Sequence, residues 1–336
     1  MADAARATIE LDAQYRQLRE ECGLLDRSAR GKLVLTGPDV ADYLQGQLTN
    51  EVEALAPGAG CYAALLDRKG HIQADMRVLR LSGAPYAPQG SIRRTGNQEG
   101  EWFWLDTEPE GTEAARRHLA TYKIGREVEV DDVTAEAAIL SLIGPRSAEV
   151  AAAAALPEHA CRRATVHGVD CLLAGTRDGL DLIADRADAG RLREALREAG
   201  AVEVAAEAVE ILRIEAGVPR FGAEMGAGTM PAEAGIVERA VSFEKGCYIG
   251  QEPVARLHYK GRPNRRLRGL RLGAPVEAGA ALRLGEKEVG RVGSACVSPA
   301  HGPIALAIVR REAEPGDELA VGEDGVTARV VEPPFG

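Results

Sequence analysis

The most informative stretch of this 336-residue chain is Lys245-Gly246-Cys247-Tyr248-Ile249-Gly250-Gln251-Glu252. Two glycines flank the Cys–Tyr pair and allow close backbone approach or unusual dihedral angles there. In an extended segment Lys245 and Cys247 would point to the same side, and the ammonium would favour the thiolate. Gln251 and Glu252 add groups that can pair with the edge of a heterocycle. On these residues alone, a reactive thiol and a buried cysteine in a glycine-rich turn are equal alternatives.

Before this stretch, short apolar segments alternate with helical patterns, which predicts an α+β or α/β body. The predicted strands are 32–36, 61–66, 72–81, 102–104, 137–143, 163–167, 169–174 and 179–184. The predicted helices are 8–22, 40–48, 112–122, 187–199 and 205–214, with an alanine-rich helix from about 144 to 156. Residues 82–100 carry Gly, Pro, Ser and Asn without periodicity and indicate a surface loop.

After about residue 262 the pattern changes to short apolar strands separated by Gly, Pro and Asp turns, with no helical periodicity. The strands are predicted at 267–272, 281–284, 288–297, 304–309, 319–321 and 328–331. This pattern is typical of a small all-β barrel. We therefore expect an α+β region over 1–260, built from two interleaved subdomains, and a C-terminal β-barrel domain over 261–336.

The composition excludes several classes of protein. With 41 Lys+Arg, 51 Asp+Glu and a net charge of −10, the chain is not expected to bind nucleic acid directly through a general basic surface. Six cysteines without a C-x-x-C pair indicate a reduced, cytoplasmic protein with free thiols. The sequence has no apolar run long enough for a membrane span, and we expect no membrane association. His159, Cys161, His167 and Cys171 match no standard zinc spacing, so no metal site is predicted.

The segment 245–252 resembles the signature K-G-C-[YF]-x-G-Q-E of the YgfZ-type folate-binding proteins, which act in iron–sulfur cluster assembly or repair and are related to the glycine-cleavage T-protein. The match continues through Val254-Ala255-Arg256 to Lys260-Gly261, and Gln47-Leu48-Thr49-Asn50 resembles the N-terminal region of the same proteins. Leu212-Arg213-Ile214-Glu215-Ala216-Gly217 and Pro231-Ala232-Glu233-Ala234-Gly235 are similar to the T-protein stretch R-x-E-A-G…P-x-E-x-G. The end of the chain resembles the T-protein barrel.

The resemblance implies a T-protein-like multidomain arrangement around a central folate cavity, with tetrahydrofolate or a derivative as cofactor. It implies that Cys247 is the reactive thiol. It implies that the cofactor is bound by Lys245, Gly246, Tyr248, Gly250, Gln251, Glu252, Arg213 and Arg177. It further implies partners among iron–sulfur client or assembly proteins, with tRNA-modifying enzymes among the clients.

Two departures separate this sequence from the T-proteins. Those proteins carry paired aspartates after a G-G turn, whereas Gly70-His71-Ile72-Gln73-Ala74-Asp75 keeps only Asp75. They also carry a T-G-E-D-G-like turn whose Glu anchors the pterin, where Gly175-Thr176-Arg177-Asp178-Gly179 has Arg177. Loss of a carboxylate removes a proton-handling group.

These departures favour the YgfZ-type interpretation, in which the chain is not a classical aminomethyltransferase. A folate-dependent aminomethyltransferase or demethylase that uses Asp75 as its acid is the alternative, and a module that only stores or senses folate is a third hypothesis. Covalent, redox and cluster-ligand chemistry are all open to Cys247. A single thiol does not complete an iron–sulfur site, because clusters take several thiolate ligands.

Overall fold

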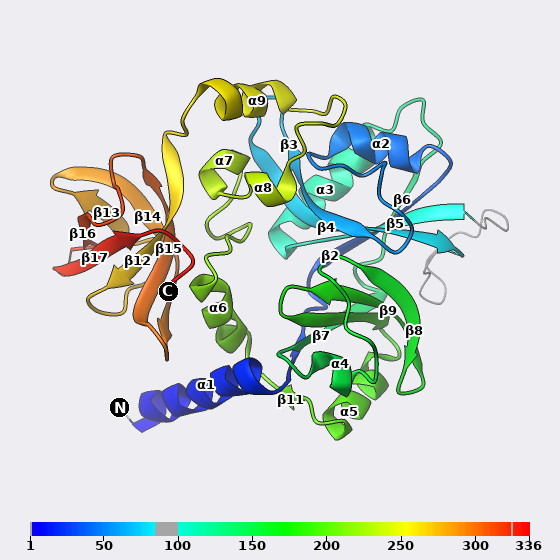
Figure 1. Ribbon diagram of the computed structural model, residues 1–336, viewed down its shortest axis with the longest axis horizontal. Helices are drawn as coiled ribbons and strands as arrows, with labels where there is room; N and C mark the ends of the chain where they lie inside the picture. The colour runs from blue at the N-terminus through cyan, green and yellow to red at the C-terminus, as the bar shows by residue number, and fades with distance from the viewer. Residues whose placement is uncertain (1, 85–99, 324) are drawn as a thin grey trace.

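The structure is a computed structural model that describes residues 2–84, 100–323 and 325–336. It contains two β-sheets and a closed barrel joined by helices (Figure 1). The barrel lies on one side of the molecule and the two sheets lie on the other, with α6 (Ala206–Glu215) between them. The N-terminal helix α1 (Ala2–Glu20) runs along one edge and reaches toward α6.

The first sheet has the strand order β3-β4-β5-β2-β6, and its neighbouring strands are antiparallel. Its strands are β2 (Gly31–Thr36), β3 (Gly60–Leu66), β4 (Ile72–Gly83), β5 (Gly100–Thr107) and β6 (Glu129–Asp132). Side chains alternate between the two faces of a strand. Leu33 and Leu35 therefore pack with α2 (Val40–Gln47) and α3 (Pro109–Thr121), while Val34 points to the opposite face.

The second sheet has the order β11-β1-β7-β10-β9-β8. Its strands are β1 (Gly23–Asp26), β7 (Ala137–Ile143), β8 (Cys161–Val166), β9 (Val169–Thr176), β10 (Gly179–Asp185) and β11 (Val202–Glu203). The helix α5 (Ala189–Glu198) covers one face with Leu192 and Leu196, which are one helical turn apart and fully buried.

The two sheets pack against each other through their remaining faces. Val34, Trp102 and Trp104 of the first sheet form one buried cluster with Ile139 and Ile183 of the second. Both tryptophans are completely buried, so their main role is packing in this interface. The interface fixes the position of β4 relative to β10, and the polar residues of both strands meet at its edge.

The barrel is closed in the order β12-β15-β14-β13-β16-β17. Its strands are β12 (Arg265–Leu272), β13 (Ala281–Leu284), β14 (Lys287–Ser298), β15 (Gly302–Arg310), β16 (Glu318–Val321) and β17 (Val326–Val331). All six predicted barrel strands are present, and the predicted α+β class with a C-terminal barrel is confirmed. Ile214 of α6 packs against Leu306 of the barrel and the C-terminal Phe335, which joins the barrel to the rest of the molecule.

The predicted alanine-rich helix to residue 156 is wrong. Only α4 (Ser147–Val150) is helical, and the backbone at Ala152 has a φ of 47°. Ala151 is buried in the core of the second sheet, and the chain must turn back there to reach β8. Alanine favours a helix by less than about 1 kcal/mol per residue over most other residues, so this tertiary requirement prevails.

The sequence patterns did not predict six short elements. These are β1, β6, β11, α7 (Pro231–Ala234), α8 (Val237–Ala240) and α9 (Gln251–Lys260). Of the predicted surface loop at 82–100, residues 85–99 lie outside the described residues, while 82–83 and 100 belong to β4 and β5.

Candidate functional site

The segment 245–252 follows α8, includes the first two residues of α9 and is bent, not extended. Gly250 precedes the first residue of α9 with a φ of +83°, a left-handed conformation that favours glycine. A Cβ atom at this position would lie 2.5 Å from the carbonyl oxygen of Asp67. Gly246 differs, because a Cβ atom there would meet no atom of the described residues within 4 Å. Only the second glycine of the segment is therefore required by the packing of the chain.

Lys245 is buried, and its ammonium donates hydrogen bonds to three backbone carbonyls at the end of α2. The acceptors are the oxygens of Gln45, Leu48 and Asn50, each 2.7 Å from Nζ. Burial lowers the pKa of Lys245 to about 8. The expected shared face with Cys247 is wrong, because Lys245 points into the protein while Cys247 is exposed. The bent backbone separates the two side chains.

Cys247 lies in a cavity of about 850 Å³. The cavity is lined by Arg68, Met230, Cys247, Tyr248, Ile249, Gly250, Gln251, Glu252, Pro253, Arg256, Leu257, Lys260 and Gly261. Six residues of the segment 245–252, from Cys247 to Glu252, therefore line the same cavity. Lys245 and Gly246 do not line it. Tyr248 packs in the core beneath, and burial raises the pKa of its hydroxyl to about 12.

Asp75 is 9% exposed on β4, away from this cavity. Its Oδ2 accepts a 2.7 Å hydrogen bond from the hydroxyl of Tyr62 on β3, while its Oδ1 is buried and has no hydrogen-bond partner among the described residues. Burial raises the pKa of Asp75 to about 6, and the nearby carboxylate of Glu108 adds to this rise. The hydrogen bond from Tyr62 acts in the opposite direction because it favours the carboxylate.

A buried network of charged side chains continues from Asp75 along β4. Arg77 is paired with Asp106 of β5 and with Asp181 of β10, both at 2.8 Å. Arg30 contacts the other oxygen of Asp106 at 3.0 Å. Burial alone would raise the pKa of Asp106, but the two guanidinium groups outweigh it and lower the pKa. Sequence reasoning missed this network, since its members come from three strands and from the turn before β2 and are far apart in the sequence.

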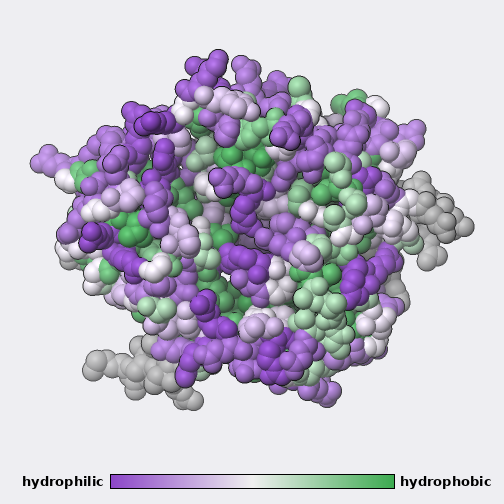
Figure 2. All heavy atoms as spheres, viewed as in Figure 1, coloured by the Kyte–Doolittle hydropathy of each residue, from purple (hydrophilic) through white to green (hydrophobic). Residues whose placement is uncertain are grey.

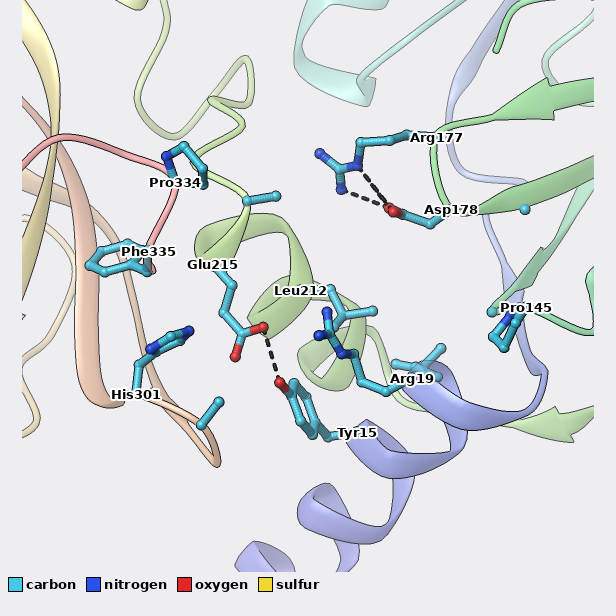
Figure 3. A pocket seen from close by; sticks show the side chains of 15 residues that line it. Tyr15, Arg19, Pro145, Arg177, Asp178, Leu212, Glu215, His301, Pro334 and Phe335 are labelled. Carbon is cyan, nitrogen blue, oxygen red and sulfur yellow. Dashed lines mark hydrogen bonds and ion pairs between the residues drawn. The ribbon is translucent and has the colours of Figure 1, made fainter. Parts of the chain in front are cut away.

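Arg177 lies in the turn between β9 and β10 and borders a second cavity of about 600 Å³ (Figure 3). Arg177 is paired with Asp178 at 2.6 Å. On the opposite wall the Tyr15 hydroxyl of α1 donates a 3.1 Å hydrogen bond to Glu215 of α6. Arg19, His301, Pro334 and Phe335 also line this cavity, so it is formed by α1, α6, the second sheet and the barrel. In the space-filling view of the same face, hydrophobic residues show in recesses between hydrophilic ones (Figure 2).

The guanidinium of Arg213, on α6, forms hydrogen bonds and ion pairs with other side chains of this protein. Its Nε donates to Glu210 at 2.8 Å, its Nη1 pairs with Glu224 at 3.0 Å, and its Nη2 donates to Ser294 of β14 at 2.5 Å. In this arrangement Arg213 connects α6 to a loop and to the barrel. Its expected pairing with a folate carboxylate stays a prediction.

The residues predicted from the sequence thus fall into four places: the Cys247 cavity, the buried position of Asp75, the cavity that Arg177 borders and the Arg213 network. Across the described ranges, no group of three or more His, Cys, Asp and Glu side chains could hold a metal ion. Helices of the described chain are all too short or too polar to cross a membrane.

Comparison with known proteins gives consistent results for both parts of the chain. Residues 5–245 match the model of the GCVT N-terminal domain, and residues 265–335 match that of the glycine cleavage T-protein C-terminal barrel domain. The aminomethyltransferase of Symbiobacterium thermophilum is 30% identical over 351 residues, covering 96% of this chain and 88% of the relative. The aminomethyltransferase of Rubrobacter xylanophilus is 29% identical, covering 97% of this chain and 86% of the relative.

Among solved structures, the glycine cleavage system aminomethyltransferase T from Bartonella henselae superimposes with a TM-score of 0.83. It covers 97% of this chain and 89% of the other, at 23% sequence identity. This likeness concerns the fold, including the arrangement of the two sheets and the barrel.

Proposed function

Because the chain belongs to the glycine cleavage T-protein family, we propose that it binds tetrahydrofolate or a derivative and takes part in one-carbon transfer of the aminomethyltransferase type. The observation that carries the proposal is the environment of Asp75. One carboxylate oxygen accepts a hydrogen bond from Tyr62, and the other is buried without a partner in the part of the chain that the structure describes. Such an oxygen is a site for a donor that a ligand brings, since buried polar atoms are otherwise almost always paired.

The residues present fit the cofactor in two respects. Asp75 Oδ1 can accept a hydrogen bond from a ring nitrogen, and Arg19 of the 600 Å³ cavity can pair with a carboxylate. When bound, tetrahydrofolate supplies the nitrogens that carry the one-carbon unit. Arg177 replaces the Glu that the resemblance assigns to pterin anchoring, so we expect the pterin to be held differently here.

Asp75 is suited to hold and release a proton at Oδ1. With a pKa of about 6, the Asp75 carboxyl is mostly ionised at neutral pH. Its pKa is still close enough to pH 7 for efficient proton exchange. Tyr62 fixes the orientation of the carboxylate, and its own pKa is raised by burial and by Asp75, so it stays a donor. Ala74 takes the place of the second aspartate, and Asp75 acts alone at this position.

The test combines binding with turnover. Tetrahydrofolate is titrated into the protein under reducing conditions, and methylenetetrahydrofolate formation from an aminomethyl donor is then followed. Asp75→Asn should keep the fold and lose turnover by about 100-fold or more, the usual contribution of a general acid or base. Asp131→Asn, on β6, is the matched control and should retain turnover. Absence of folate binding, or full turnover by Asp75→Asn, would overturn the proposal.

A second candidate function rests on Cys247, whose thiol is exposed in a cavity made by the motif that resembles the YgfZ-type signature. In this candidate the folate-binding chain assists assembly or repair of iron–sulfur clusters in client enzymes, including tRNA-modifying ones. Client or assembly proteins would supply the remaining thiolates, because clusters take several.

The discriminating experiment expresses Cys247→Ala in cells lacking the protein and measures the activity of iron–sulfur enzymes. Loss of rescue by Cys247→Ala, with rescue retained by Cys296→Ala, is expected if this candidate is right. Full rescue by Cys247→Ala would exclude it. Turnover that depends on Asp75 but not on Cys247 would support the aminomethyltransferase-type function alone.

A further inference from the structure

The Cys247 cavity combines a free thiol with room for a small molecule. Cys247 is the exposed cysteine of the chain, whereas Cys22, Cys61, Cys161, Cys171 and Cys296 are buried or half-buried. The cavity volume of about 850 Å³ falls within the range of about 300–1,000 Å³ that is usual for small-molecule sites. A ligand bound here would lie against the sulfur atom.

The charge of this cavity is opposite to that of the whole chain. Arg68, Arg256 and Lys260 line it and have no ion-pair partner in the part of the chain that the structure describes, and Glu252 is the acidic residue of the lining. The helix α9 begins at the cavity with Gln251, and its N-terminus adds partial positive charge. In a chain with a net charge of −10, this is a local site for anions.

The hydroxyl of Tyr248, at the cavity, has no hydrogen-bond partner among the described residues. Tyr248 lines the cavity, and its side chain is 7% exposed. A buried hydroxyl without a partner costs about 1–3 kcal/mol. The hydroxyl oxygen itself has almost no exposed surface, so a ligand that entered the cavity would have to shift part of the lining to pair with it.

From these features we propose that the cavity binds anionic low-molecular-weight disulfides and that Cys247 exchanges with them. The Cys247 thiol loses its proton to solvent, and its sulfur attacks one sulfur of the disulfide. A new S–S bond forms to Cys247, and the original S–S bond breaks. The released thiolate leaves with the electron pair and takes up a proton, so Cys247 is oxidised while the other half of the disulfide is reduced.

The cations determine which disulfides react fastest. Opposite charge raises the local concentration of a ligand and its rate of association, by 10-fold or more at low ionic strength. Exposed charges are screened by salt beyond a Debye length of about 10 Å at 0.1 M. The preference for anionic disulfides should therefore decrease as salt is added.

The experiment uses the full chain, reduced and without folate, so that its result is independent of the function proposed above. The protein is incubated with oxidised glutathione (anionic), hydroxyethyl disulfide (neutral) or cystamine (cationic), and adduct formation is followed by intact mass spectrometry and peptide mapping. Each rate is divided by the rate of the same disulfide with a free model thiol. We expect modification at Cys247 and a normalised preference of about 10-fold or more for oxidised glutathione at low salt.

The variants Arg256→Gln and Lys260→Gln, made singly and together, should reduce this preference and leave the normalised rate of hydroxyethyl disulfide unchanged. Arg262→Gln removes a neighbouring cation that does not line the cavity and is the matched control. Arg68→Gln, on a different segment, repeats the test if the α9 variants unfold. Equal normalised rates for the three disulfides, or adducts on other cysteines, would overturn the proposal.

Discussion

The Tyr62 hydroxyl donates a 2.7 Å hydrogen bond to Oδ2 of Asp75, and the two residues lie on the neighbouring strands β3 and β4. This pairing places a carboxylate with a raised pKa next to a fixed donor. The second oxygen of the carboxylate is buried and finds no hydrogen-bond partner in residues 2–84, 100–323 and 325–336. The Asp75 carboxyl is therefore important both for the stability of the fold and for the chemistry that we propose.

Asp75→Asn should alter the pH dependence of stability. Because the folded pKa of about 6 exceeds the reference value of 3.8, the folded state binds more protons than the unfolded state between these pH values. The wild-type free energy of unfolding should therefore fall as pH rises from about 4 to about 6, by up to about 3 kcal/mol relative to Asp75→Asn. Urea unfolding of both proteins across this range measures the difference, and parallel profiles would contradict the assignment.

Lys245→Met should destabilise the fold by about 3 kcal/mol or more, because three carbonyl oxygens at the end of α2 lose their common donor. Lys69→Met removes an exposed ammonium and should change stability by less than about 0.5 kcal/mol. Denaturant unfolding of the two variants measures the contrast. Similar stabilities would show that water replaces the ammonium at these carbonyls.

The two glycines of the motif should respond differently to alanine. Gly250→Ala should cost at least about 2 kcal/mol, because it combines a left-handed backbone with a Cβ atom 2.5 Å from a carbonyl oxygen. The added methyl group of Gly246→Ala meets no neighbour within 4 Å in the described part of the chain, so this variant should cost less than about 1 kcal/mol. Thermal or urea unfolding tests this, and equal costs would mean that the local backbone differs from the one described.

Arg213→Met should destabilise the protein by about 3–5 kcal/mol, because it leaves the fully buried side chain of Glu224 without its cation. Arg220→Met removes a more exposed partner of Glu210, at 3.4 Å, and should cost about 1 kcal/mol or less. Adding Glu224→Gln to Arg213→Met should recover part of the loss. No recovery in the double variant would show that the carboxylate is not the source of the cost.

The sequence by itself determined the α+β class, the six strands of the barrel and the family resemblance. Strand and helix periodicity, together with Gly and Pro at turns, are local properties, so they can be read without knowing which segments meet. Motif similarity also identified the segment around Cys247. It did not reveal α9 or the bent backbone, because these depend on the packing of Gly250 against Asp67.

Only the tertiary structure decided what the singled-out side chains contact. Lys245 bonds to carbonyls that are 195 to 200 residues earlier in the chain, and Tyr15 reaches Glu215 across 200 residues. Burial, charge pairing and unpaired atoms arise from such distant contacts, which no local pattern encodes. For this reason Lys245 and Arg213 form their hydrogen bonds inside the protein, and Asp75 is buried with a raised pKa. Cys247, in contrast, is exposed and lies near several cations.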